Sequence, residues 1–143
     1  MKMNFERLLS NKKIEEVNKT DFNLDLIESG LKFAKKGIET ENYNWAMSLI
    51  YESIIKMING FMNFLGYRAI GKEHHKNAFE FLREINIKQS FVEYFDDIRV
   101  KRNNFIYRDI ANTSKKEVEE IIEKANEFVQ EIRTFVHKIE TQK

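Results

Sequence analysis

The sequence contains no cysteine and no proline, and only five of its 143 residues are glycine. Without cysteine, the chain can form neither a disulfide framework nor a thiolate metal site. Without proline, and with so little glycine, few positions can interrupt a helix. These absences favour a protein that is almost entirely helical.

Long uncharged runs and an excess of charge of one sign are also missing. The longest uncharged stretch, residues 57–67, is far shorter than the roughly 20 residues that a membrane-spanning helix needs. The first residues lack the apolar core of a secretion signal, so we expect a cytoplasmic protein with no membrane segment. Because the formal net charge is only +1, binding of nucleic acid would have to depend on a local basic patch.

Most motifs of catalytic and cofactor sites are absent as well. The glycines do not have the spacing of a phosphate-binding or dinucleotide-binding loop, and no Glu-x-x-His pair could build a di-iron site. The adjacent His74 and His75 would project about 100° apart on a helix, which suits the polar start of a helix better than a shared metal. His137 is expected on the surface of the last helix. The sequence therefore predicts neither a metal nor a cofactor.

The residues that are present form helical patterns. Hydrophobic residues make up 42% of the chain, enough for one core at this length. Apolar residues recur at three- and four-residue spacing in four or five segments. We expect one domain over residues 1–143, with an N-terminal extension or short helix at 1–20 and the bundle core at 21–139. The predicted fold is all-α, a four- to five-helix up-and-down bundle without strands.

The expected ends of the helices rest on a few residues. Asp21 is expected to cap the first long helix, and Gly37 to mark its end. The second long helix should end at Gly66. Ser114 and Glu117 form a capping box, Ser-x-x-Glu, ahead of the last and most regular helical pattern.

One residue interrupts the apolar stripe of the helix that precedes the capping box. Phe91, Phe95, Ile98, Arg102 and Phe105 fall on the same helical face, so the guanidinium is predicted to point toward a partner helix. Arginine stays charged in proteins and is costly to desolvate alone, so this position needs an anionic or hydrogen-bonding partner or an opening to solvent. A carboxylate, a phosphate or another subunit could satisfy it.

Neighbouring residues extend this cationic face. Arg99 lies one turn before Arg102, and Asn103, Asn104 and Tyr107 add hydrogen-bond donors, so these five are the predicted binding residues. RNA or a nucleotide phosphate would suit such a face.

A purely structural interpretation is also open. In it, the carboxylates of Asp96, Asp97 and Asp109 neutralise both arginines, and the segment only fastens the bundle. Trp45 and Tyr51, in the long second helix, are interpreted in the same way, as aromatic residues that fill the core.

Two segments, together with the aromatic Tyr51, resemble a known family. GYRAIGKEHHKNAFEFL (residues 66–82) and FDDIRVKRNNFIY (residues 95–107) are similar to the HEPN domain, the "higher eukaryotes and prokaryotes nucleotide-binding" family. The resemblance implies a helical bundle that forms a homodimer. Many members are metal-independent RNase toxins with a nucleotidyltransferase-type antitoxin as partner. Their hallmark is an arginine followed, after four to six residues, by a histidine.

That hallmark is only partly present here. Arg102 and Asn103 match its start, but Tyr107, Arg108 and Asp109, where the histidine is expected, include no imidazole. RNA cleavage needs groups that take and give a proton near neutral pH. A tyrosine, with an ordinary pKa of about 10, suits this task poorly, whereas a histidine, at about 6.5, suits it well. We therefore expect no efficient RNase activity.

Three functions remain. We favour a HEPN-like binding or interaction module, in a toxin–antitoxin or nucleotidyltransferase-partnered system, that docks a partner or an anionic ligand at Arg102. The first alternative is an RNase with an altered active site, in which Arg102, Asn103 and Tyr107 act together with His74 or His75. The second is a helical dimerisation scaffold without a small ligand, in which carboxylates pair with both arginines and no cleft opens beside them.

Overall fold

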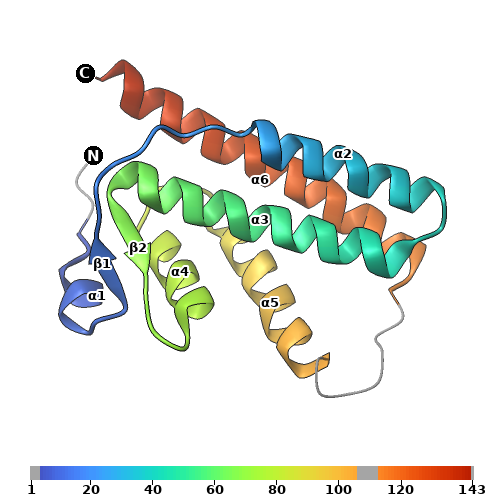
Figure 1. Ribbon diagram of the computed structural model, residues 1–143, viewed down its shortest axis with the longest axis horizontal. Coiled ribbons are helices and arrows are strands. Elements are labelled where there is room, and N and C mark those ends of the chain that lie inside the picture. Colours follow the sequence, from blue (N-terminus) through green and yellow to red (C-terminus); the bar gives the residue numbers. More distant parts are fainter. Residues whose placement is uncertain (1–3, 106–112, 143) are drawn as a thin grey trace.

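The computed structural model describes residues 4–105 and 113–142, and at residues 104 and 105 it describes only the backbone. Helices account for nearly all of the regular structure (Figure 1). In chain order the elements are α1 (Glu6–Ser10), β1 (Ile14–Glu16), α2 (Asp25–Glu39), α3 (Tyr43–Leu65), β2 (Tyr67–Ala69), α4 (His74–Arg83), α5 (Gln89–Phe105) and α6 (Lys115–Thr141). The prediction of an all-α bundle is confirmed.

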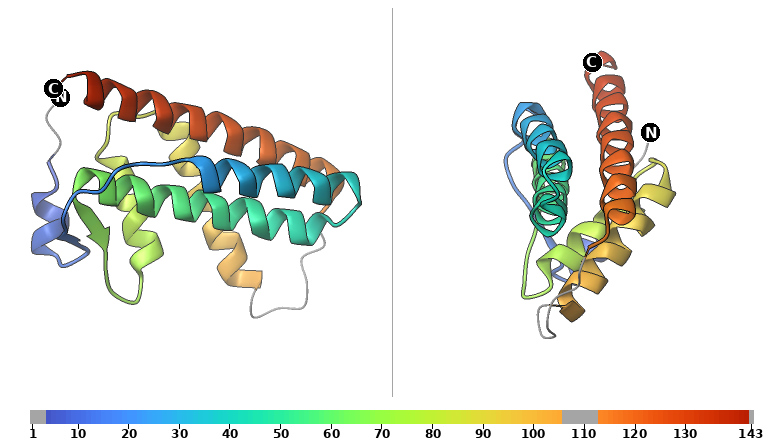
Figure 2. Two further views of the ribbon diagram at one scale, coloured as in Figure 1. Left: turned by 45° about the horizontal axis from the view of Figure 1, so that its top comes forward. Right: turned by 90° about the vertical axis from the view of Figure 1, so that its right-hand side faces the viewer.

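Three long helices form the body of the bundle. α2 and α3 run antiparallel as a helical hairpin, and α6 packs along both of them (Figure 1). α4 and α5 lie together against one side of this body, and α5 runs at a steep angle to the long helices (Figure 2). The C-terminal end of α5 thus lies near the start of α3 and the start of α6, which is where the candidate site is found.

The core joins α5 to α6 through aromatic rings. Phe128 of α6 is fully buried, and its ring stacks on Phe91 at 5.7 Å and on Phe95 at 5.6 Å between centroids. The periodicity of α5 predicted that Phe91 and Phe95 lie on its buried face. Large rings between the helices hold α5 at a distance from α6 while keeping the contact dry.

Two of the predicted helix ends are confirmed. Gly66 ends α3 in the left-handed conformation, with φ 94°, which glycine adopts without steric cost. At the start of α6, the backbone N–H of Glu117 donates to Ser114 Oγ at 3.1 Å, as the capping box requires.

Two other predicted helix ends are wrong. Asp21 caps no helix, because α2 begins only at Asp25 and residues 17 and 20 donate backbone hydrogen bonds to the end of α3, which holds this stretch against it. Gly37 does not end α2, which continues to Glu39. A Cβ at Gly37 would lie 2.6 Å from Trp45 Cε3, so the glycine is there for close approach of α2 and α3.

The expectation of no strands is also wrong. β1 pairs antiparallel with β2, with Ile14 opposite Ala69 and Glu16 opposite Tyr67. Each strand has three residues, too few for an alternating pattern to stand out in the sequence. The small sheet fastens the N-terminal segment beside α4, on the far side of α5 from the candidate site (Figure 1).

Candidate ligand-binding cleft

Arg102 lies near the C-terminal end of α5 and points toward α3. Its Nη1 donates to Ser48 Oγ at 3.3 Å, and its Cζ lies 4.9 Å from the centroid of the Tyr51 ring. Arg102 is half-buried, and it follows the buried Ile98 of the same stripe by one turn of α5. Among residues 4–105 and 113–142, no carboxylate forms an ion pair with it. A charged group is therefore held in place by a neutral hydroxyl and an aromatic face.

Tyr51 acts as the platform for this guanidinium. Burial raises the pKa of the Tyr51 hydroxyl, and the charges of Arg102 and Arg99 oppose that rise without cancelling it. The phenol is consequently neutral near pH 7. The interpretation of Tyr51 as core filling holds only in part, because the half-buried ring packs against the core with one face and against Arg102 with the other.

Trp45 differs from its interpretation as core filling. Its side chain is 53% exposed, and it covers Gly37 on the outer surface of the α2–α3 hairpin. The apolar spacing of α3 includes Trp45 at its edge, and spacing alone does not show which side of the helix the hairpin leaves uncovered.

Arg99 has a different environment from Arg102. Its Nε lies 2.6 Å from Asp96 Oδ1, and the other oxygen of Asp96 accepts from Arg83 Nη2 at 2.5 Å. Arg83 also donates to Glu93, at 2.9 Å. This ion-pair network ties α4 to α5. Arg99 thus has a carboxylate partner of its own, as the structural interpretation expects. Asp96 forms no ion pair with Arg102, the other arginine of the predicted cationic face.

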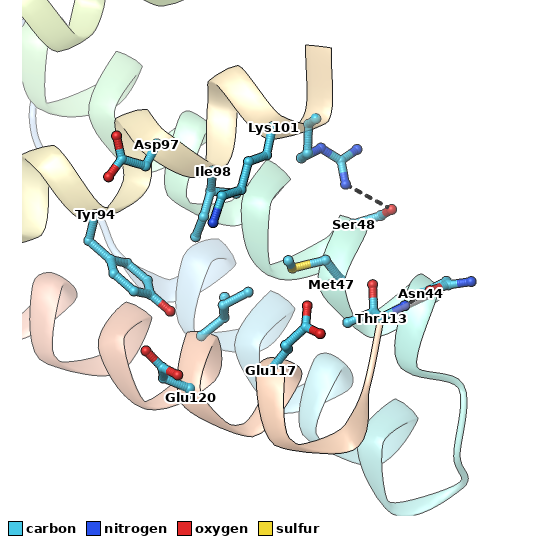
Figure 3. Close-up of a pocket in the computed structure, with 12 residues that line it drawn as sticks. Asn44, Met47, Ser48, Tyr94, Asp97, Ile98, Lys101, Thr113, Glu117 and Glu120 are labelled. Atoms are coloured by element: carbon cyan, nitrogen blue, oxygen red, sulfur yellow. Dashed lines mark hydrogen bonds between the residues drawn. The ribbon is translucent and has the colours of Figure 1, made fainter. Parts of the chain in front are cut away.

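A cleft of about 440 Å³ opens beside Arg102 (Figure 3). α5 contributes the cations Lys101 and Arg102. The floor is apolar and comes from three helices, with Met47, Ile98 and Ile121. Its volume lies within the range of about 300–1,000 Å³ that is typical of sites for small ligands.

The opposite wall of the cleft is acidic. It carries Glu117 and Glu120 of α6. A third carboxylate that lines the cleft, Asp97, belongs to α5, one turn before Lys101. The Tyr94 hydroxyl points toward the Glu120 carboxylate (Figure 3), and burial together with that negative charge raises the pKa of Tyr94 to about 12. In the part of the chain that the structure describes, neither glutamate forms an ion pair with Lys101 or Arg102. The cleft therefore presents opposite charges on facing walls.

The two adjacent histidines lie in the first turn of α4. His74 Nδ1 is 3.1 Å from the carbonyl oxygen of Gly71, and the two imidazole centroids are 4.1 Å apart. Neither ring lines the cleft. The pKa of His75 is lowered, first by burial, then by the charges of His74 and Arg99. His75 thus lies near the Arg99 end of the cationic face, away from the Arg102 cleft.

The remaining predicted residues fall outside the cleft or outside the description. Asn103 is exposed and does not line the cleft. The side chain of Asn104 and the whole of Tyr107 lie beyond the described residues, as does Asp109, one of the carboxylates of the structural interpretation. Sequence reasoning missed Ser48, Tyr94, Glu117 and Glu120 as site residues. Their only signal was helical spacing: Ser48 precedes Tyr51 by one turn, and Glu120 follows Glu117 by one turn.

The sequence matches the model of a known protein family. The HEPN domain profile matches residues 28–135, about three quarters of the chain. The chain belongs to the HEPN domain family. The matched residues run from α2 into α6 and include Arg102 and the whole cleft. No curated protein and no solved structure matched the chain.

Two further observations concern metal binding and membrane-spanning helices in this HEPN domain. Within residues 4–105 and 113–142, no three histidine, aspartate or glutamate side chains lie close enough together to hold a metal ion. Among the described helices, none is both long enough and apolar enough to cross a membrane.

Proposed function

We propose that this HEPN domain is a non-catalytic binding module that holds an anionic group with Arg102 at the mouth of the cleft. The observation that carries the proposal is the half-buried guanidinium, which has a hydroxyl and an aromatic ring as partners but no carboxylate among the described residues. An arginine side chain has five N–H donors. A phosphate or carboxylate of a ligand could accept several of them in paired, charge-assisted hydrogen bonds.

The environment of Arg102 favours binding over a purely structural role. A scaffold would gain most from pairing this arginine internally, as Asp96 does for Arg99 at 2.6 Å. Ser48 and Tyr51 instead fix the direction of the guanidinium, and no carboxylate of residues 4–105 or 113–142 pairs with it. A cation positioned in this way loses little side-chain freedom when an anion binds.

The chemistry of the cleft does not support RNA cleavage. No imidazole lines it, and the Tyr94 hydroxyl, with a pKa of about 12, is poorly suited to accept or give a proton near neutral pH. The chain also lacks a histidine at positions 107–109, where the family hallmark would place it. The family resemblance further favours a homodimer, with a nucleotidyltransferase-type protein as a candidate partner. The absence of a secretion signal pattern and of cysteine favours the cytoplasm as its location.

Replacing Arg102 with alanine should weaken anion binding. We expect the affinity for a 5′-phosphorylated RNA pentanucleotide with fluorescein at its 3′ end, measured by fluorescence anisotropy, to fall about tenfold, because charge-assisted hydrogen bonds contribute roughly 1.5–3 kcal/mol. The slope of log K against the logarithm of the salt concentration should also become shallower, by about the amount that one phosphate contact contributes. The matched control is Lys115→Ala, which removes an exposed cation at the start of α6. Equal affinities for the Arg102→Ala and Lys115→Ala variants would contradict the proposal.

An RNase with an altered site is the second candidate function. What favours it is His75, whose pKa is lowered first by burial and then by the charges of His74 and Arg99, so that the ring is neutral near pH 7. The ring does not line the Arg102 cleft, however, and its aromatic neighbour is His74, which does not line the cleft either.

Incubation with labelled RNA should therefore give no cleavage. We expect the purified protein to give no cleavage of an end-labelled RNA above background, with and without chelator. The His75→Ala variant should behave identically. Gel analysis of the products measures this. Cleavage that disappears in His75→Ala would establish the second candidate in place of the first.

A further inference from the structure

The acidic wall of the cleft restricts which anion can bind beside Arg102. Ser114 Oγ donates to Glu117 Oε1 at 3.1 Å, so the capping box holds this side chain, and its carboxylate points into the cleft (Figure 3). Glu120 lies one turn further along the same face of α6. Both are acceptors fixed on a rigid helix, facing the cations of α5.

Three carboxylates line the cleft, those of Asp97, Glu117 and Glu120, and the Tyr94 hydroxyl lies against Glu120. Together they repel a ligand with negative charge along its whole length. An RNA backbone lying through the cleft would place phosphates beside Glu117 and Glu120. A ligand with one anionic group at the Arg102 end and hydrogen-bond donors at the other end matches both walls. The apolar floor of Met47, Ile98 and Ile121 between them suits the face of an aromatic ring.

We propose that the cleft binds a guanosine with a single phosphate, with the phosphate at Arg102 and Lys101 and the guanine edge at Glu117 and Glu120. Guanine carries two neighbouring donors, N1–H and the 2-amino group, and a carboxylate can accept both at once. Adenine, cytosine and uracil each present at least one acceptor on the corresponding edge, which a carboxylate would repel. The inference rests on the proposed role of Arg102, and it adds the identity of the ligand.

The volume of the cleft is consistent with this ligand. About 440 Å³ accommodates a nucleoside monophosphate and leaves no room for a folded peptide segment. A free nucleotide and the 5′-terminal nucleotide of an RNA share this chemistry. The experiment therefore has to separate the two sources.

The test is isothermal titration of the full chain with GMP, IMP, AMP and inorganic phosphate. IMP lacks only the 2-amino group, so GMP is expected to bind about tenfold more tightly than IMP, and AMP more weakly still. The double variant Glu117→Gln, Glu120→Gln should bind GMP and IMP equally, while its capping box, Ser-x-x-Gln, is preserved. Glu119→Gln, on an exposed position of the same helix, is the matched control and should keep the preference for GMP.

The outcomes separate this inference from the proposed function. Equal binding of GMP, IMP and AMP that still depends on Arg102 would overturn the guanine assignment and leave the binding role of Arg102 standing. No binding of any of these ligands would overturn both. A 5′-phosphorylated trinucleotide that begins with guanosine provides the second arm. Tighter binding of the trinucleotide than of GMP would identify the end of an RNA as the source, and weaker binding would identify the free nucleotide.

Discussion

Phe128→Ala is expected to lower the free energy of unfolding by about 4 kcal/mol, the usual cost of removing a buried phenylalanine from a core. The Phe128 side chain has no exposed surface. It stacks on Phe91 and Phe95 at 5.7 and 5.6 Å between centroids, so both rings of α5 would lose their partner. The cavity would lie where α5 meets α6.

Urea denaturation followed by circular dichroism measures this loss. Phe33→Ala is the matched control, because the Phe33 side chain is 56% exposed and its truncation should cost less than about 1 kcal/mol. Similar losses in the two variants would show that α5 and α6 are not held together by this aromatic cluster.

Asp96→Ala is expected to have the second largest effect, a loss of about 2 kcal/mol. Asp96 joins Arg99 to Arg83, and the side chains of Asp96 and Arg99 are 13% and 12% exposed. Removing the carboxylate leaves the Arg99 guanidinium half-buried without an ion-pair partner among the described residues, and the link between α4 and α5 is lost. Arg83 loses less, because it is 34% exposed and keeps Glu93.

The control for Asp96→Ala is Asp97→Ala in the same denaturation experiment. Asp97 is the next residue on α5, but it is exposed. Its replacement should change the free energy of unfolding by no more than about 0.5 kcal/mol. If Asp97→Ala destabilises the protein as much as Asp96→Ala, the network with Arg99 and Arg83 does not stabilise the fold as described.

Most of the helical architecture could be predicted from local patterns. The α6 stripe, the Ser114–Glu117 capping box and the end of α3 at Gly66 each depend on residues within one or two turns of one another. The features that were missed depend on partners far away in the sequence. The sheet pairs residue 14 with residue 69, and Gly37 is explained only by the approach of Trp45.

The candidate site could be predicted only where its signal lies within a single helix. Arg102 could be found because a charged residue in the apolar stripe of a single helix is a local anomaly. Its partners Ser48 and Tyr51 come from α3, and Glu117 and Glu120 come from α6. No pattern within α5 indicates which faces of the other two helices lie opposite it, because this depends on the steep angle at which α5 runs (Figure 2).

If Arg102 binds an anion and Arg99 does not, an NMR titration with inorganic phosphate that follows the Nε–H signals of the arginine side chains will separate the two. We expect a saturable shift of the Arg102 signal, with the Arg99 signal unchanged because Asp96 already accepts from its Nε. No shift at Arg102, or shifts of equal size at all arginines, would contradict this expectation.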